Sequence, residues 1–257
     1  MQVLTNIYNL IKATRHYLPQ YRLLSVLESF LGLPYSMEDN LKTYSLIHFD
    51  CVTMVEVVLA LLFVKDLSSL ENFQKDFEKK LMKIRYFDSS HDFITRNHFI
   101  TLDWLAHSKD YLMDITSDIH QTKISTTVID KDNWFFKTHH LKKTLLPPAT
   151  VKIPYIDNLA VLNHYDELIK YFPPVSIVNI VRPNWELKSK IGTNLDISHL
   201  GFAIKHAGDL TFWHASSNCN MVVYDQLKAY IIKQQHIPSI KGINVQSIIK
   251  DSINEYI

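Results

Sequence analysis

The chain has 257 residues, and its 27 Lys and Arg against 26 Asp and Glu give a formal net charge of +1. This balance argues against a nucleic-acid binder that relies on a basic face, because phosphate neutralisation needs clustered cations. Hydrophobic residues make up 47% of the chain, so a substantial core can form and wholesale disorder is excluded. The chain has only 5 glycines, and no dinucleotide fingerprint or phosphate-binding P-loop can be written from them.

The first half of the chain is predicted to be helical. Apolar residues recur at helical spacing over 3–11 and 23–30. Residues 51–64 are apolar nearly all round, which predicts a helix enclosed on every side. Residues 67–82 are amphipathic and highly charged, which predicts a surface helix.

The second half changes character. β-Branched runs at 122–129 and 175–181 predict strands. Residues 200–204 and 210–213 flank a short polar turn and predict a hairpin. Helices followed by strands indicate an α+β fold rather than a parallel βαβ array.

The two cysteines, Cys51 and Cys219, are too few for a disulfide scaffold or a zinc ribbon, although they could form a single bridge. Asp50 is a good N-cap, so Cys51 is expected at the first position of the buried helix. The positive end of the helix dipole favours a thiolate there, which suits a nucleophile. The commoner alternative for a single cysteine is a small apolar residue that only packs.

A base for this nucleophile is available in the predicted hairpin, where His199 and His214 lie on opposite strands. If Lys205 pairs with Leu210, the two histidines are diagonal neighbours, and a turn at 206–207 places them directly opposite each other. Both registers bring the imidazoles to one face, whereas a loop with an odd number of residues separates them. A nucleophile, a base and a group that orients the base form the general catalytic triad.

Four short blocks resemble, in order, those of the NlpC-type cysteine peptidases, papain-like enzymes that cut bacterial cell-wall peptides. They are LGLPY at 31–35, DC at 50–51, HLGFA at 199–203 and WHAS at 213–216. DCVTMVE at 50–56 is similar to the DCVTFVE of the N-acetylmuramoyl-L-alanine amidase-like branch, and so are IRYFD at 84–88 and RNHFITLDW at 96–104. The Gly-Asp pair usual before the histidine hairpin is replaced by Pro173-Pro174.

The resemblance implies an α+β, papain-like fold in which an antiparallel sheet packs on a helix that starts at the nucleophile. It implies a single catalytic domain over 1–257, with residues 1–30 as a helical extension of the core 31–257. It implies that Cys51 is the nucleophile, His199 the base and His214 the orienting group, and Tyr35 matches the family tyrosine beside them. No metal or other cofactor is expected.

The implied activity is hydrolysis of the amide between N-acetylmuramic acid and L-alanine in peptidoglycan fragments. The alternatives are cleavage at γ-D-glutamyl-diaminopimelate within the stem peptide, thiol acyl transfer, and a binding module without turnover. The expected partner is a muropeptide rather than nucleic acid. No apolar run approaches the ~20 residues that a bilayer requires, and the N-terminal residues lack the apolar segment of a signal peptide. We therefore expect either a mature protein of the cell envelope or periplasm, or a protein that is cytoplasmic or delivered by another route.

A second group of candidate residues could hold the substrate. Arginine can bind a stem-peptide carboxylate bidentately, and tryptophan can stack on a sugar. The structural alternative is a junction in which Asp103 pairs with Arg96 and Trp104 fills the core. Glu56 lies on the buried helix, where it needs either a substrate ammonium or an internal arginine as a partner. The candidate substrate-binding residues are Arg96, Asn97, His98, Asp103 and Glu56.

Overall fold

A computed structural model describes residues 2–37, 44–88, 92–143 and 145–249. The helices, in chain order, are α1 (Gln2–Thr14), α2 (Pro19–Phe30), α3 (Cys51–Leu62), α4 (Leu70–Arg85), the π-helical turn η1 (Ile100–Trp104), α5 (Leu105–His107), α6 (Thr116–Ile119), α7 (Lys131–His139), α8 (Asn158–Asn163), α9 (Tyr165–Tyr171), α10 (Lys188–Ile191) and α11 (Leu227–Gln234). The strands are β1 (Leu112–Asp114), β2 (Lys123–Ile129), β3 (Ala149–Asp157), β4 (Val175–Trp185), β5 (Leu195–His206), β6 (Asp209–Ser216), β7 (Met221–Gln226) and β8 (Gly242–Ile248).

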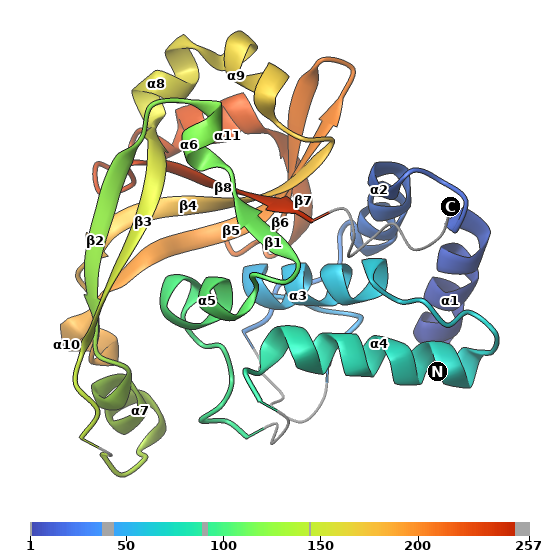
Figure 1. Ribbon diagram of the computed structural model, residues 1–257, viewed down its shortest axis with the longest axis horizontal. Coiled ribbons are helices and arrows are strands. Elements are labelled where there is room, and N and C mark those ends of the chain that lie inside the picture. The colour runs from blue at the N-terminus through green and yellow to red at the C-terminus, as the bar shows by residue number, and fades with distance from the viewer. Residues whose placement is uncertain (1, 38–43, 89–91, 144, 250–257) are drawn as a thin grey trace.

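The strands of the described residues form one antiparallel sheet in the order β2-β3-β8-β4-β5-β6-β7, and β1 also pairs with β8. Helices α1 to α4 lie on one side of this sheet, and α8, α9 and α11 lie on the other (Figure 1). The predicted α+β class with an antiparallel sheet is therefore confirmed. Among the described residues, no helix combines the length and apolar character needed to cross a membrane.

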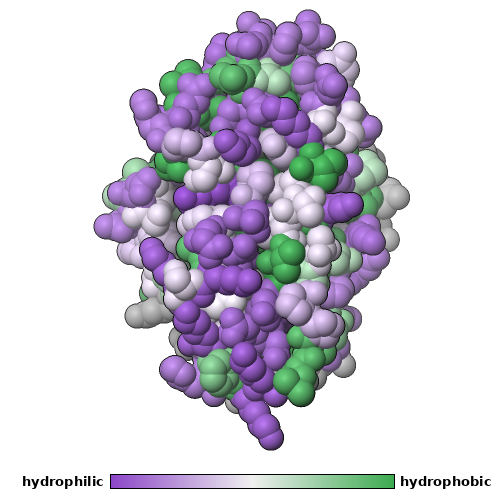
Figure 2. Space-filling view, turned by 90° about the vertical axis from the view of Figure 1, so that its left-hand side faces the viewer, coloured by the Kyte–Doolittle hydropathy of each residue, from purple (hydrophilic) through white to green (hydrophobic). Residues whose placement is uncertain are grey.

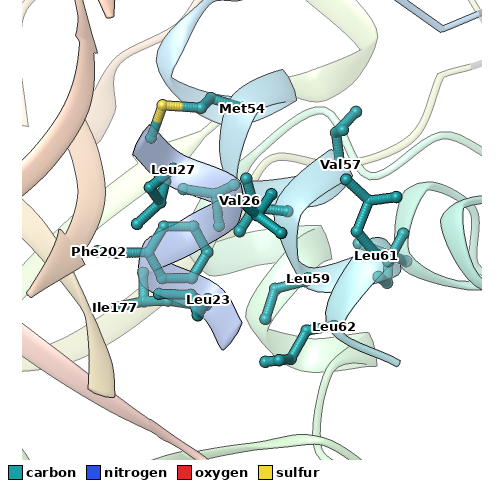
Figure 3. Packing of buried hydrophobic residues seen from close by; sticks show 14 of the residues in the cluster. Leu23, Val26, Leu27, Met54, Val57, Leu59, Leu61, Leu62, Ile177 and Phe202 are labelled. Carbon is teal, nitrogen blue, oxygen red and sulfur yellow. The ribbon is translucent and has the colours of Figure 1, made fainter. Parts of the chain in front are cut away.

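Helix α3 is at the centre of the larger core, which packs on one face of the sheet. Side chains from α2 and α3 interdigitate with Ile177 of β4 and Phe202 of β5 (Figure 3). From Met54 to Leu62 every residue of α3 is buried, as the apolar run predicts. The opposite face of the sheet carries a second core, to which Phe212 of β6 and Tyr230 of α11 belong.

The outer surface of the β2–β3 ribbon contrasts with this interior. β2 exposes alternate residues to solvent, as expected for an edge strand with one buried face. Seen face-on, this side of the molecule is mostly hydrophilic and its hydrophobic side chains are scattered (Figure 2). Single exposed apolar residues of this kind are normal for a folded protein.

All of the predicted helices and strands are present, with boundaries that differ by a few residues. The charged surface helix begins at Leu70 rather than at residue 67 and continues to Arg85. The reason is local hydrogen bonding: the Ser68 N–H donates to Asp66, and Ser69 caps the helix by accepting from the Asn72 N–H. The prediction of residues 67–69 as helix was therefore wrong.

The hairpin that carries the two candidate histidines has a two-residue turn. Lys205 pairs with Leu210, which is the first of the two registers expected from the sequence. Ala207 and Gly208 both adopt positive φ, which suits the twist of a tight hairpin. On the same strands, a Cβ at Gly201 would lie 2.4 Å from the Trp213 carbonyl oxygen and 2.9 Å from the His214 Cβ. Glycine thus allows β5 and β6 to approach closely beside the histidines.

Candidate active site

The start of α3 is fixed by a capping box. The Asp50 carboxylate accepts hydrogen bonds from the backbone N–H groups of Val52 and Thr53, both at 2.8 Å. In return, the Thr53 hydroxyl accepts from the Asp50 N–H at 2.9 Å. These bonds satisfy donors that the first helical turn leaves open. Cys51 is consequently held as the first residue of α3, between a rigid cap and a buried helix.

A separate segment brings Tyr35 next to this helix start. Tyr35 forms a bridge with Phe49, and the Phe49 N–H donates to the Pro34 carbonyl at 3.0 Å. On its other side, the Tyr35 N–H donates to the Asn220 carbonyl at 2.9 Å. Burial, with smaller contributions from the nearby Cys51 and Asp50, raises the pKa of Tyr35 to about 12. The Tyr35 hydroxyl is therefore protonated and can donate a hydrogen bond at neutral pH.

The two hairpin histidines are in direct contact. His199 Nε2 lies 2.8 Å from His214 Nδ1, and the ring planes are nearly perpendicular at 86°. The backbone of Leu200, the residue that follows His199, lies near enough to the Cys51 thiol to favour its ionised form. The structure thus gathers Tyr35, Cys51, His199 and His214 from four separate parts of the chain.

Two further residues at this cluster were not predicted from the sequence. The Tyr230 ring centroid lies 5.2 Å from that of His214 and 6.2 Å from that of His199. Asp225 Oδ2 lies 3.3 Å from His214 Nε2, and the other carboxylate oxygen accepts from Lys233 Nζ at 2.9 Å. A strand predicted at 221–226 and a helix after it would have placed both residues beside the β5–β6 hairpin.

Glu56 lies inside the protein, one turn after the cysteine. Its side chain is fully buried, and its Oε2 lies 2.8 Å from Arg85 Nε and 3.5 Å from Arg96 Nη2. Of the two partners considered for Glu56, the structure therefore supplies the internal arginine. This interior pairing accounts for the buried charge of Glu56, and a contact of Glu56 or Arg96 with substrate stays a prediction.

Asn97, Asp103 and Trp104 are also buried. Asn97 donates to the Ile84 carbonyl at 3.0 Å, and its Oδ1 is 2.8 Å from His107 Nδ1. Asp103 binds Lys131 Nζ at 2.8 Å rather than the expected Arg96, and also accepts from two backbone N–H groups. The polar groups of Asn97 and Asp103 thus serve the fold, and a contact of either residue with substrate stays a prediction. Trp104 fills the core as expected.

His98 lies among aromatic rings near α7. Its Nε2 is 2.7 Å from the Phe93 carbonyl oxygen, and its ring centroid is 4.7 Å from that of Trp134. Burial is the main cause that lowers the pKa of His98, to about 3. His98 is therefore neutral at physiological pH, and a contact with substrate stays a prediction.

Cys219 is exposed and, like Cys51, is a free thiol, so the two cysteines form no bridge.

The chain matches, over residues 26–240, a family described as AmiA-like, N-acetylmuramoyl-L-alanine amidase-like. The chain belongs to this amidase-like family. Among solved structures it resembles Legionella pneumophila LPG0564, with 29% identity and a TM-score of 0.85 over 96% of this chain and 95% of that one. It shares the fold of an N-acetylmuramoyl-L-alanine amidase from Bacteroides uniformis, with 21% identity and a TM-score of 0.64 over 90% and 99% of the two chains. No curated protein matches the chain.

In this member of the amidase-like family, the charge state of the cysteine differs from the sequence-based expectation. Burial and then the Asp50 carboxylate raise the pKa of Cys51 to about 12, although backbone N–H groups including that of Leu200 act in the opposite direction. Burial and the neighbouring His214 lower the pKa of His199 to about 3. The expected thiolate at the helix start is thus corrected: desolvation outweighs the helix dipole. At neutral pH the resting pair is a thiol and a neutral imidazole.

Replacing Glu56 tests its structural role. Glu56→Ala leaves two buried guanidinium groups without their shared carboxylate, so we expect a loss of about 3–5 kcal/mol in the free energy of unfolding, measured by denaturant titration. The matched control is Glu71→Ala, because Glu71 is a helical glutamate whose ion pair with Lys75 is exposed, and little change is expected there. A Glu56→Ala protein of wild-type stability would contradict the internal role.

Alkylation rates test the charge state of Cys51. In a Cys219→Ser background, Cys51 should react slowly with iodoacetamide at pH ~7, since a raised thiol pKa leaves little thiolate, and faster as the pH rises. Asp50→Asn keeps a capping side chain but removes a negative charge that raises this pKa, so labelling should accelerate. Asp157→Asn, at the cap of α8, is the control and should have no effect. Rapid wild-type labelling already at pH ~6 would instead support the helix-dipole expectation.

Proposed function

We propose that the protein is a cysteine hydrolase that cleaves the amide between N-acetylmuramic acid and L-alanine in peptidoglycan fragments. The observation that carries the proposal is the packing of α3, which starts at Cys51, against β5 and β6, the strands that hold the hydrogen-bonded His199–His214 pair. Membership of the amidase-like family supports the choice of bond. A buried helix that begins at the cysteine and packs on histidine-bearing antiparallel strands also supports the papain-like, NlpC-type assignment.

The resting charge state determines the first step. His199 takes the thiol proton as Cys51 Sγ attacks the amide carbonyl carbon, so charge develops only as the new C–S bond forms. The oxyanion that results can accept hydrogen bonds from the Cys51 backbone N–H, at the positive end of α3, and from the Tyr35 hydroxyl. Donors fixed in advance in a water-poor site stabilise this charge without reorganisation.

The remaining steps return the enzyme to its starting state. The His199 imidazolium gives its proton to the leaving nitrogen, the C–N bond breaks, and L-alanine departs with its stem peptide as a free amine. A thioester between Cys51 and the lactyl group remains. His199 then takes a proton from water, which attacks the thioester and releases the lactyl carboxylate and the thiol.

Product analysis with defined muropeptides tests this function. Wild-type protein should release free stem peptide and a muramic acid derivative that lacks the peptide, both identified by mass. Cys51→Ala should lower the rate by at least roughly 10³-fold, since the nucleophile is lost. The matched control is Cys219→Ser, which changes an exposed thiol and should keep wild-type activity.

Other outcomes would contradict the proposal. A muramyl dipeptide product would indicate cleavage inside the stem peptide, and transfer of the acyl group to an added amine would indicate an acyltransferase. Absence of turnover by the wild-type protein would indicate a binding module.

A further inference from the structure

A line of hydrogen bonds continues beyond the catalytic pair. His199 Nε2 lies 2.8 Å from His214 Nδ1, and His214 Nε2 lies 3.3 Å from Asp225 Oδ2. Asp225 Oδ1 in turn accepts from Lys233 Nζ at 2.9 Å. The residues belong to β5, β6, β7 and α11, so the line runs from the exposed Lys233 to His199.

The carboxylate fixes where the protons lie. Partial burial opposes ionisation, but the hydrogen bonds from Lys233 and His214 lower the pKa of Asp225, so it is a carboxylate and can only accept. His214 Nε2 must then carry the proton of its hydrogen bond with Asp225. Burial lowers the pKa of His214, so its ring is neutral and its Nδ1 is an unprotonated acceptor. His199 Nε2 must therefore be the donor to His214.

The consequence for His199 follows from the two nitrogens of a neutral imidazole. Because Nε2 carries the proton, Nδ1 has a free lone pair, and it is the nitrogen not committed to His214. We propose that Asp225, held in place by Lys233, is a positioning residue that sets the tautomers of both histidines and so leaves His199 Nδ1 free to act as the base. This assignment rests on the proposed function of the Cys51 site.

The opposite tautomer shows what Asp225 prevents. If His214 Nδ1 carried the proton, it would donate to His199 Nε2, and the His199 proton would lie on Nδ1. That nitrogen could then no longer accept the thiol proton of Cys51. With Asp225 in place this arrangement leaves Asp225 Oδ2 without the His214 donor and costs a charge-assisted hydrogen bond. Without Asp225 the two arrangements become closer in energy.

Kinetics of Asp225 variants test the positioning role. Asp225→Ala should lower kcat for muropeptide hydrolysis by roughly 10- to 100-fold, a part of what general-base catalysis contributes, and leave KM nearly unchanged. Asp225→Glu keeps the acceptor and should restore most of the lost rate. The matched control is Asp157→Ala: Asp157 pairs with Lys123 at 2.8 Å and has the same 25% side-chain exposure as Asp225, but lies outside the site.

Nitrogen-15 NMR of the histidine rings reads the tautomers without any substrate. In the wild-type protein both His199 and His214 should show the Nε2–H tautomer, with signals assigned through His199→Asn and His214→Asn. Asp225→Ala should add a population with the proton on Nδ1. The spectra of Asp225→Glu and Asp157→Ala should resemble that of the wild type.

The pH profile of kcat/KM adds a test in which two substitutions should shift the acidic limb in opposite directions. The groups that face the histidines are Asp225 of β7 and Tyr230 and Lys233 of α11, and Cys51 of α3 lies near Tyr230. Asp225 favours the charged form of His214 and Lys233 opposes it. The acidic limb should therefore move to lower pH in Asp225→Ala and to higher pH in Lys233→Met. Lys123→Met, which removes an equally exposed lysine, should leave the limb in place.

The outcomes separate this inference from the proposed function. A wild-type protein that hydrolyses muropeptides, with unchanged kcat and tautomers in Asp225→Ala, would overturn the role of Asp225 alone. A wild-type protein without turnover would contradict the proposed function, while the NMR spectra would still decide whether Asp225 sets the tautomers. An Nδ1–H tautomer of His199 in the wild-type protein would also overturn the inference.

Discussion

Helix α3 packs against strand β5, and the Leu200 backbone of that strand acts on the Cys51 thiol at the start of the helix. This contact requires a helix buried on all sides, because α3 passes between the sheet and the other N-terminal helices. Cys51 itself is half-buried, and the atoms packed around it make its ionised form unfavourable. The packing of α3 thus sets both the position and the charge state of this thiol. Under the proposed function, a proton transfer would therefore accompany attack by Cys51.

Burial of α3 also explains several charged groups in the interior. Glu56 follows the cysteine on the same helix, and Arg85 and Arg96 neutralise it in the interior. At the far end of the helix, Arg22 donates to the Leu62 carbonyl, a C-terminal group without a helical partner. Both ends and one side of α3 are therefore held by hydrogen bonds, which limits movement of Cys51 relative to His199.

The sequence was informative where local rules decide the outcome. Three local features predicted the correct structure because they depend only on neighbouring residues. They are the helix cap at Asp50, the alternation of side chains between the two faces of the strands that carry His199 and His214, and the apolar run of α3. Partners distant in sequence could not be derived in this way: Asp103 pairs with Lys131 instead of Arg96, and Asp225 reaches His214 through a strand that was not predicted. The pKa of Cys51 was mispredicted for a related reason. A helix dipole is a local property, whereas desolvation depends on everything that packs around the thiol.

The most direct test of this account is an ultraviolet difference titration of the thiolate, comparing the protein with its Cys51→Ser variant in a Cys219→Ser background. A thiol with a raised pKa predicts no thiolate absorbance from Cys51 between pH ~5 and pH ~8, and its appearance only at strongly alkaline pH. A thiolate signal that develops below pH ~6, together with protonation of His199, would show an ion pair at rest and contradict the account.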